Sequence, residues 1–236
     1  DPYSAKRGFW YSHIGWMLRE YGIEQDYEYS NCKDLQQDAM VMWQHRHYLP
    51  LVLGTNFGIP ILLGLWHGDL WGMILLVGVA RLAIAHHFTF FINSLAHIWG
   101  SQPYSDQNSS KDNGLLAVLT MGEGYHNYHH TFQRDYRNGI RWWHFDPTKC
   151  LIRGLAGLGM ATKLYRTPLE RIETLRAQML LLRTSRKLVD LPHADILLLR
   201  LQGEYEALIH KIEEFAQAKK QWIEANAASV MSYDLD

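Results

Sequence analysis

Three histidines, His126, His129 and His130, stand close together in the segment GEGYHNYHHTF at residues 122–132. In a helix, residues three and four positions apart share a face, so the three imidazoles can point at one place. Such spacing is typical of a metal-binding site. The alternative is a patch of surface histidines, which would not require this register.

A second polar pair, Asn93 and His97, lies upstream in the segment FINSLAHIWG near the end of an apolar stretch. The two residues also share a helix face. By itself, such a pair is more often hydrogen-bonded at a helix interface than bound to a metal. Beside the histidine triplet, however, we expect Asn93 and His97 to belong to the same metal site.

Two apolar segments precede the triplet and must position it. Residues 49–66 carry no charge, and residues 70–99 form an apolar run interrupted by Arg81, His86 and His87 before it reaches Asn93 and His97. Both are long enough to cross a bilayer, which takes roughly 17 to 25 residues. Tryptophans, which favour membrane interfaces, stand at the segment ends: Trp66, Trp71 and Trp99. The pattern predicts a membrane-embedded helical hairpin in which Arg81 snorkels or is paired; the alternative is two buried core helices.

The length of the second segment places the metal site relative to the bilayer. At 1.5 Å per helical residue, Leu70 to His97 spans about 40 Å, longer than the roughly 30 Å hydrocarbon core. His97 should therefore emerge from the lipid at the far interface. The open end of the hairpin is flanked by basic residues, and the link between the segments has none: Lys33, Arg46, Lys111 and Arg134. We therefore expect the metal site on the cytoplasmic side.

Composition excludes other classes of partner and site. The net charge of −1 argues against binding to nucleic acid. Cys32 and Cys150 have no ligand-like spacing, so neither a disulfide framework nor an iron–sulfur centre is expected.

The pattern changes from about residue 167. Thr167, Pro168 and Glu170 predict a capping box with proline at the first helical position. Residues 198–222 then carry apolar side chains at alternating spacings of three and four. This pattern predicts a coiled-coil-like helical tail. Self-packing is the default expectation for the tail, and the alternatives are pairing between subunits or docking of a redox partner.

Together these patterns predict an all-α protein with a membrane-embedded helical hairpin, a cytoplasmic helical cap and a helical tail. The expected parts are a cytoplasmic segment at 1–48, the hairpin at 49–99, the cap with its histidine triplet and an interfacial helix at 100–165, and the tail at 166–236.

Three motifs carry a resemblance to a known family. GEGYHNYHHTF, NSLAH and the opening DPYSAKRGFWYSHIGWML resemble the membrane-bound fatty acyl desaturases of the stearoyl-CoA (delta-9) type, in a version that looks bacterial. The similarity covers roughly residues 1–165. It implies a four-helix membrane domain with a cytoplasmic cap, and two irons held by histidines. The implied reaction inserts a cis double bond, with delta-9 the favoured position, into a saturated acyl chain and consumes O2 and two electrons.

The resemblance also implies roles for individual residues. His97, His126, His129 and His130 match iron ligands, and Asn93 matches a position that reaches an iron through water. A ring of neutral nitrogen ligands with open coordination positions suits iron in oxygen chemistry. The aromatic residue one turn before Asn93 is Phe90, which matches a position near the bound acyl chain and is otherwise an ordinary core residue.

Two further residues are candidates for supporting roles. Glu123, one turn before His126, is placed to accept an imidazole N–H and orient the ring; alternatively its charge interacts with a helix N-terminus. Arg46 lies between His45 and His47, where it could meet a substrate headgroup or coenzyme phosphate. The alternative for His45, Arg46 and His47 is an ordinary place at the membrane interface.

In the family, two further histidine motifs, of the forms HxxxxH and HxxHH, precede the DPYSAKRGF segment, and the chain does not contain them; its own HNYHH at residues 126–130 is the later, third motif. We therefore expect the sequence to be the C-terminal part of a longer enzyme and to be inactive alone. The implied substrate is a fatty acyl-CoA or an acyl lipid. A separate electron donor is expected, either ferredoxin-like or a cytochrome b5 and reductase. The expected location is the bacterial inner membrane, in a pathway of unsaturated fatty acid biosynthesis.

Two other classes of protein remain open. A membrane zinc hydrolase would also cluster histidines outside the bilayer, but its HExxH motif is absent. The second is a non-catalytic membrane scaffold organised by the helical tail. Two irons per complete chain would support the desaturase, one zinc the hydrolase, and no metal the scaffold.

Overall fold

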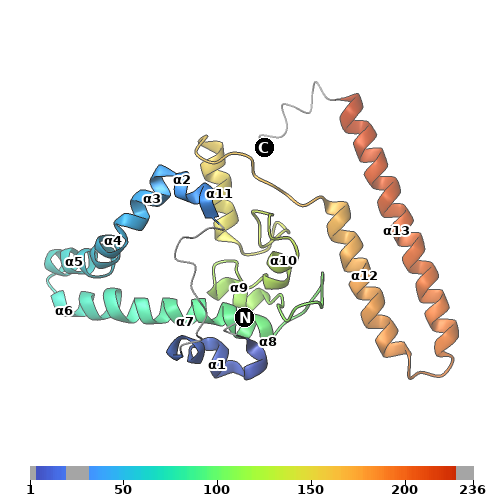
Figure 1. The fold of residues 1–236 in the computed structure, drawn as a ribbon, viewed down its shortest axis with the longest axis horizontal. Helices are drawn as coiled ribbons and strands as arrows, with labels where there is room; N and C mark the ends of the chain where they lie inside the picture. Colours follow the sequence, from blue (N-terminus) through green and yellow to red (C-terminus); the bar gives the residue numbers. More distant parts are fainter. Residues whose placement is uncertain (1–3, 20–31, 227–236) are drawn as a thin grey trace. The chain divides into compact units, whose positions relative to one another are not determined.

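The computed structural model of the chain describes residues 4–19 and 32–226. Within these ranges the backbone forms helices, turns and two isolated bridge pairs, with no strand. The predicted all-α class is confirmed (Figure 1). The chain divides into two compact units, and the main part of the first is Trp10–Phe90, while the main part of the second begins at Phe91.

The first unit contains the apolar hairpin. Its described helices are the end of α1 (Phe9–His13), the 3-10 helix η2 (Gly15–Leu18), α2 (Lys33–Gln37), α3 (Ala39–Arg46), α4 (Tyr48–Leu53), the π-helix η4 (Gly54–Gly58), α5 (Ile59–His67), α6 (Leu70–Met73), the π-helix η5 (Ile74–Ala80) and most of α7 (Arg81–Asn93). Two helical stretches, Tyr48–His67 and Leu70–Ile98, are 20 and 29 residues long and apolar enough to cross a membrane. Only 11% and 6% of their most apolar windows are buried, which argues against the alternative of two core helices.

A tight turn joins the two apolar stretches. Gly68 ends α5 in a left-handed conformation (φ 84°) and donates its N–H to the Gly64 carbonyl at 2.9 Å. Asp69 caps the next helix by accepting from the Gly72 N–H at 2.8 Å. A Cβ at Gly64 would lie 2.8 Å from the Cα of Leu70, so the close approach of the two helices requires glycine there.

The arginine in the second apolar stretch is paired. The Arg81 Nη2 donates to Asn56 Oδ1 of the first stretch at 2.5 Å, and its Nε donates to the Val77 carbonyl at 2.7 Å. Of the two expectations for Arg81, pairing is therefore the one observed. The bond also ties the two apolar helices together.

The second unit carries the histidines. Its helices are η1 (Ala5–Arg7), α8 (Leu95–Ile98), α9 (Gly114–Leu119), α10 (His126–Thr131), α11 (Pro147–Gly157), α12 (Leu169–Leu188) and α13 (Ala194–Ala225). Its buried core is mainly aromatic: Tyr104, Ala117, Tyr125, Tyr128, Phe132 and Ile172. Tyr128 of α10 belongs to this core, so the helix that carries the histidine triplet packs against the interior of the unit through that side chain.

The two long tail helices lie side by side, as the default expectation of self-packing required (Figure 1). α12 ends at Leu188 and α13 begins at Ala194, so the break between the two helices contains Pro192. The predicted capping box at Thr167 is wrong. Pro168 is the N-cap without a side-chain hydrogen bond, and Thr167 is instead buried with its N–H donated to Asp135.

Candidate metal centre

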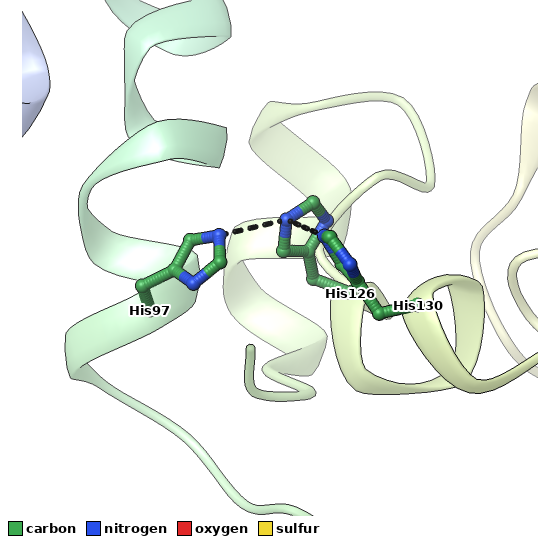
Figure 2. A group of neighbouring side chains, drawn as sticks. All are labelled: His97, His126 and His130. Atoms are coloured by element: carbon green, nitrogen blue, oxygen red, sulfur yellow. Dashed lines mark hydrogen bonds between the residues drawn. The ribbon is translucent and has the colours of Figure 1, made fainter. Parts of the chain in front are cut away.

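Three histidines from two helices converge on one point. His97 comes from α8, and His126 and His130 come from α10 (Figure 2). The Nε2 atom of His126 lies 3.1 Å from the Nε2 of His97 and 3.1 Å from the Nε2 of His130. Among the described residues this is the one group of three whose ligand atoms approach so closely, all within 4.8 Å of one another.

The donor set of the trio fits a metal ion. Metal–nitrogen bonds of about 2.0–2.1 Å place neighbouring ligand nitrogens about 3 Å apart. Burial, together with His130, His97 and His129, lowers the pKa of His126 to about 3. Burial and His129 also lower the pKa of His130. These imidazoles are therefore neutral near pH 7, which is the form that binds metals.

His129 lies outside the trio. Its ring centroid is 6.1 Å from that of His126 and 5.8 Å from that of His130. The reason is helical geometry: at 100° per residue, position 130 returns to within about 40° of position 126, while position 129 falls about 60° short on the other side. The ligand role of His129 stays a prediction.

The structure gives Glu123 a partner other than an imidazole. Its Oε1 accepts a hydrogen bond from Asn138 Nδ2 at 3.1 Å. The carboxylate thus anchors the turn that follows α10. Asn93 is the last residue of α7 and is half-buried. Between Asn93 and His97, Ser94 interrupts the helix with a ψ of −76°. Asn93 and His97 therefore do not share one face as closely as they would in a regular helix.

The two predicted substrate residues lie in the first unit. Phe90 is surrounded by imidazoles, with ring centroids 5.5 Å from His13 and 5.9 Å from both His86 and His87. Arg46 ends α3 with an exposed side chain. Their roles toward a substrate stay predictions.

Two glycines beside the triplet allow the close packing that places His126. A Cβ at Gly124 would lie 2.1 Å from the backbone nitrogen of Ala117 in α9, a distance no side chain can adopt. Gly122 has a φ of 109°, and a Cβ there would lie 2.9 Å from Asp146 Oδ1. These two glycines are visible in the sequence as GEG at residues 122–124, shortly before His126. The spacing of the histidines alone did not predict that this position requires glycine.

A buried aspartate holds the far end of α10. Asp135 Oδ2 accepts from the Tyr128 hydroxyl at 2.7 Å and from the Thr167 N–H at 2.7 Å. Arg137 donates to both carboxylate oxygens, at 3.0 and 2.9 Å. Burial alone would raise the pKa of Asp135, but the bonds from Arg137, the Thr167 backbone and Tyr128 lower it to about 2. This charged cluster joins α10 to the start of α12.

Comparison with known proteins places the chain in a family. The fatty acid desaturase family model matches residues 1–162. A probable acyl-CoA desaturase of Schizosaccharomyces pombe is 45% identical over 179 residues, 73% of this chain and 36% of the relative. The acyl-CoA desaturase 1 of Saccharomyces cerevisiae is 42% identical over 177 residues, covering 73% and 34%. Stearoyl-CoA desaturase 5 of Bos taurus is 34% identical over 182 residues, covering 75% and 54%.

The chain thus spans between about a third and a half of the length of these relatives. The matched region contains the two apolar helices and all three converging histidines. The chain therefore belongs to the fatty acid desaturase family.

Proposed function

We propose that the chain takes part in fatty acyl desaturation, in which a saturated acyl chain loses two hydrogens and gains a cis double bond at the delta-9 position. O2 is reduced to two waters with the two electrons of the acyl chain and two from a donor. The observation that carries the proposal is the convergence of His97, His126 and His130 in a chain of this family.

His97, His126 and His130 would hold iron, with His129 as a further ligand and Asn93 acting through water. A pair of irons, when bound, would supply the activation of O2 that removal of hydrogen from an unactivated methylene demands. The protein's own contribution is to keep the ligand nitrogens neutral by burial and to hold α10 in place through Asp135 and Gly124.

The proposed substrate is an acyl-CoA, because the similar yeast and bovine proteins are named for acyl-CoA and stearoyl-CoA. An acyl lipid is the other candidate, since a relative from Arabidopsis thaliana that is 36% identical is named a probable lipid desaturase. We propose that Phe90 lines the path of the acyl chain and Arg46 meets its polar end. Electrons would come from a separate ferredoxin-like or cytochrome b5-type donor, with the site on the cytoplasmic side of the bacterial inner membrane.

His126→Ala tests the proposal in cells that express the complete gene. The change removes the central nitrogen of the trio, so we expect loss of the unsaturated product in the fatty acid profile, with iron content reduced in the purified protein. His210→Ala is the matched control, because His210 is an exposed residue of α13 that lies beside Glu214 of the same helix. An unchanged product in His126→Ala would overturn the ligand role, and one zinc with no iron would favour the hydrolase.

A further inference from the structure

The ring of His97 is held by a residue from the loop that leads to α9. The Nδ1 of His97 lies 2.9 Å from the hydroxyl oxygen of Ser109. The other ring nitrogen, Nε2, is the one that faces His126 at 3.1 Å. For Nε2 to offer its lone pair to a metal, Nδ1 must carry the proton. Ser109 is placed to accept that proton in a hydrogen bond, which selects the binding tautomer and fixes the plane of the ring.

The position of Ser109 is in turn fixed by Asn127, the neighbour of His126 in α10. Asn127 is fully buried, with 0% exposure. Its Nδ2 donates to the Ser105 carbonyl at 2.8 Å and to the Ser110 carbonyl at 3.1 Å. Its Oδ1 accepts from the Tyr104 N–H at 3.0 Å. One amide therefore fastens both ends of the loop that carries Ser109.

Three additional hydrogen bonds order the same loop, and one of them ties it to α8. Asn108 Oδ1 accepts from the N–H of Ser110 at 3.0 Å and from its hydroxyl. The N–H of Lys111 donates to the Ala96 carbonyl at 2.7 Å, next to His97. The loop thus connects the residue before His97 with the residue after His126 through short hydrogen bonds.

We propose that Ser109 and Asn127 are positioning residues for the metal centre: Asn127 clamps the 104–110 loop to α10, and Ser109 on that loop orients the imidazole of His97 toward His126. The inference rests on the proposed metal-binding function of the trio. Ligand orientation through the distal ring nitrogen is a general feature of histidine metal sites, and loss of such a partner typically weakens metal affinity roughly 10- to 100-fold.

The test is titration of the purified full chain in detergent with Co²⁺, whose visible absorption reports both affinity and ligand geometry. Ser109→Ala should weaken Co²⁺ binding roughly tenfold or more and change the absorption bands, while the unfolding temperature stays that of wild type. Ser109→Thr, which keeps the hydroxyl, should restore affinity and spectrum. Ser105→Ala is the matched control, because it removes a hydroxyl of the same loop that accepts from the Gln107 N–H and, within the described residues, does not contact His97.

Asn127→Asp supplies a second variant of nearly the same shape that lacks the hydrogen bonds donated by Nδ2. We expect it to weaken Co²⁺ binding at least as much as Ser109→Ala, because the whole loop is released. Wild-type affinity and spectrum in Ser109→Ala, or equal losses in Ser109→Ala and Ser105→Ala, would overturn the positioning role. If instead His126→Ala binds Co²⁺ as tightly as wild type, the metal-site proposal itself fails, and the two failures are thereby distinguished.

Discussion

At the scale of single residues, the central histidine stays neutral because it is buried. His126 is 6% exposed, and burial with three neighbouring imidazoles lowers its pKa to about 3. In the unfolded chain the same group titrates near 6.5. The unfolded state therefore binds the proton first as the pH falls, so the contribution of His126 to stability is present above about pH 6.5 and declines below it.

This difference gives a pH-dependent prediction. Between pH 7 and pH 5, protonation of His126 in the unfolded chain should cost about 2 kcal/mol of folding free energy. Asp112 acts in the opposite direction, because burial raises its pKa to about 7. The measurement is therefore the difference between wild type and His126→Gln in chemical denaturation of the metal-free protein, and parallel pH curves for the two would contradict it.

A second prediction concerns the buried carboxylate. Asp135→Asn should destabilise the protein by about 3 kcal/mol, because it leaves the half-buried guanidinium of Arg137 without its counter-charge. Thermal unfolding in detergent measures the change. Asp106→Asn is the control: its ion pair with Arg186 is largely exposed and should be worth no more than about 1 kcal/mol. Similar losses in the two variants would refute the special role of Asp135.

The residue pattern predicted that His126 and His130 lie together, because helical spacing alone brings them to one face. His97 was assigned to the same site from a separate motif, and His129, which the pattern also included, lies outside the group of three. The pattern did not predict Ser109 or Asn127, because their hydrogen bonds depend on the path of an irregular loop. For the same reason the partner of Glu123 is Asn138, a residue from the following turn. Regular geometry is readable from spacing, whereas contacts made by loops are not.

At the scale of elements, the packing of α9 against the residues before α10 depends on one missing side chain. Gly124→Ala would place a methyl group 2.1 Å from the Ala117 backbone, so α9 and the start of α10 must separate. We expect a loss of about 3 kcal/mol in unfolding free energy and weaker Co²⁺ binding by the trio.

Gly154→Ala is the matched control for that change. Gly154 lies within α11, and a Cβ there meets nothing within 4 Å. Because alanine favours a helix over glycine, this control should be neutral or slightly stabilising. Equal stability and metal affinity in Gly124→Ala and Gly154→Ala would show that the close approach is not needed.

The long elements were predictable, and their ends were less so. Hydropathy located both apolar helices because an uncharged run of that length has few alternatives. The helix start at Leu169 was predicted within a residue, but its capping was not. Threonine is a common capping residue, but the N–H of Thr167 donates to the buried Asp135. This tertiary hydrogen bond overrides the local preference for a cap.

At the scale of the whole molecule, contacts divide the chain between Phe90 and Phe91, inside α7. Hydropathy gives no signal at that point, since the apolar run continues to residue 98. The proposed four-part division follows polarity instead of contacts. The four predicted parts differ in the side of the membrane on which each is expected to lie.

We expect the hairpin turn and the histidine-bearing region on opposite sides of the membrane. An impermeant maleimide added to sealed spheroplasts should label His67→Cys, made with Cys32→Ser and Cys150→Ser, at the turn. The native Cys150, exposed in the second unit, should react only after lysis when Cys32 is replaced by serine. Labelling of both positions from the same side would contradict a membrane-spanning hairpin.

The separation of the converging histidines along the chain governs when the centre can form. His97 lies one residue before the end of the second apolar stretch, and His126 follows 29 residues later. During synthesis, the stretch that bears His97 therefore leaves the ribosome before α10 does. We therefore expect ion capture to follow the synthesis of α10, because a chain stalled before His126 carries only one of the three converging histidines.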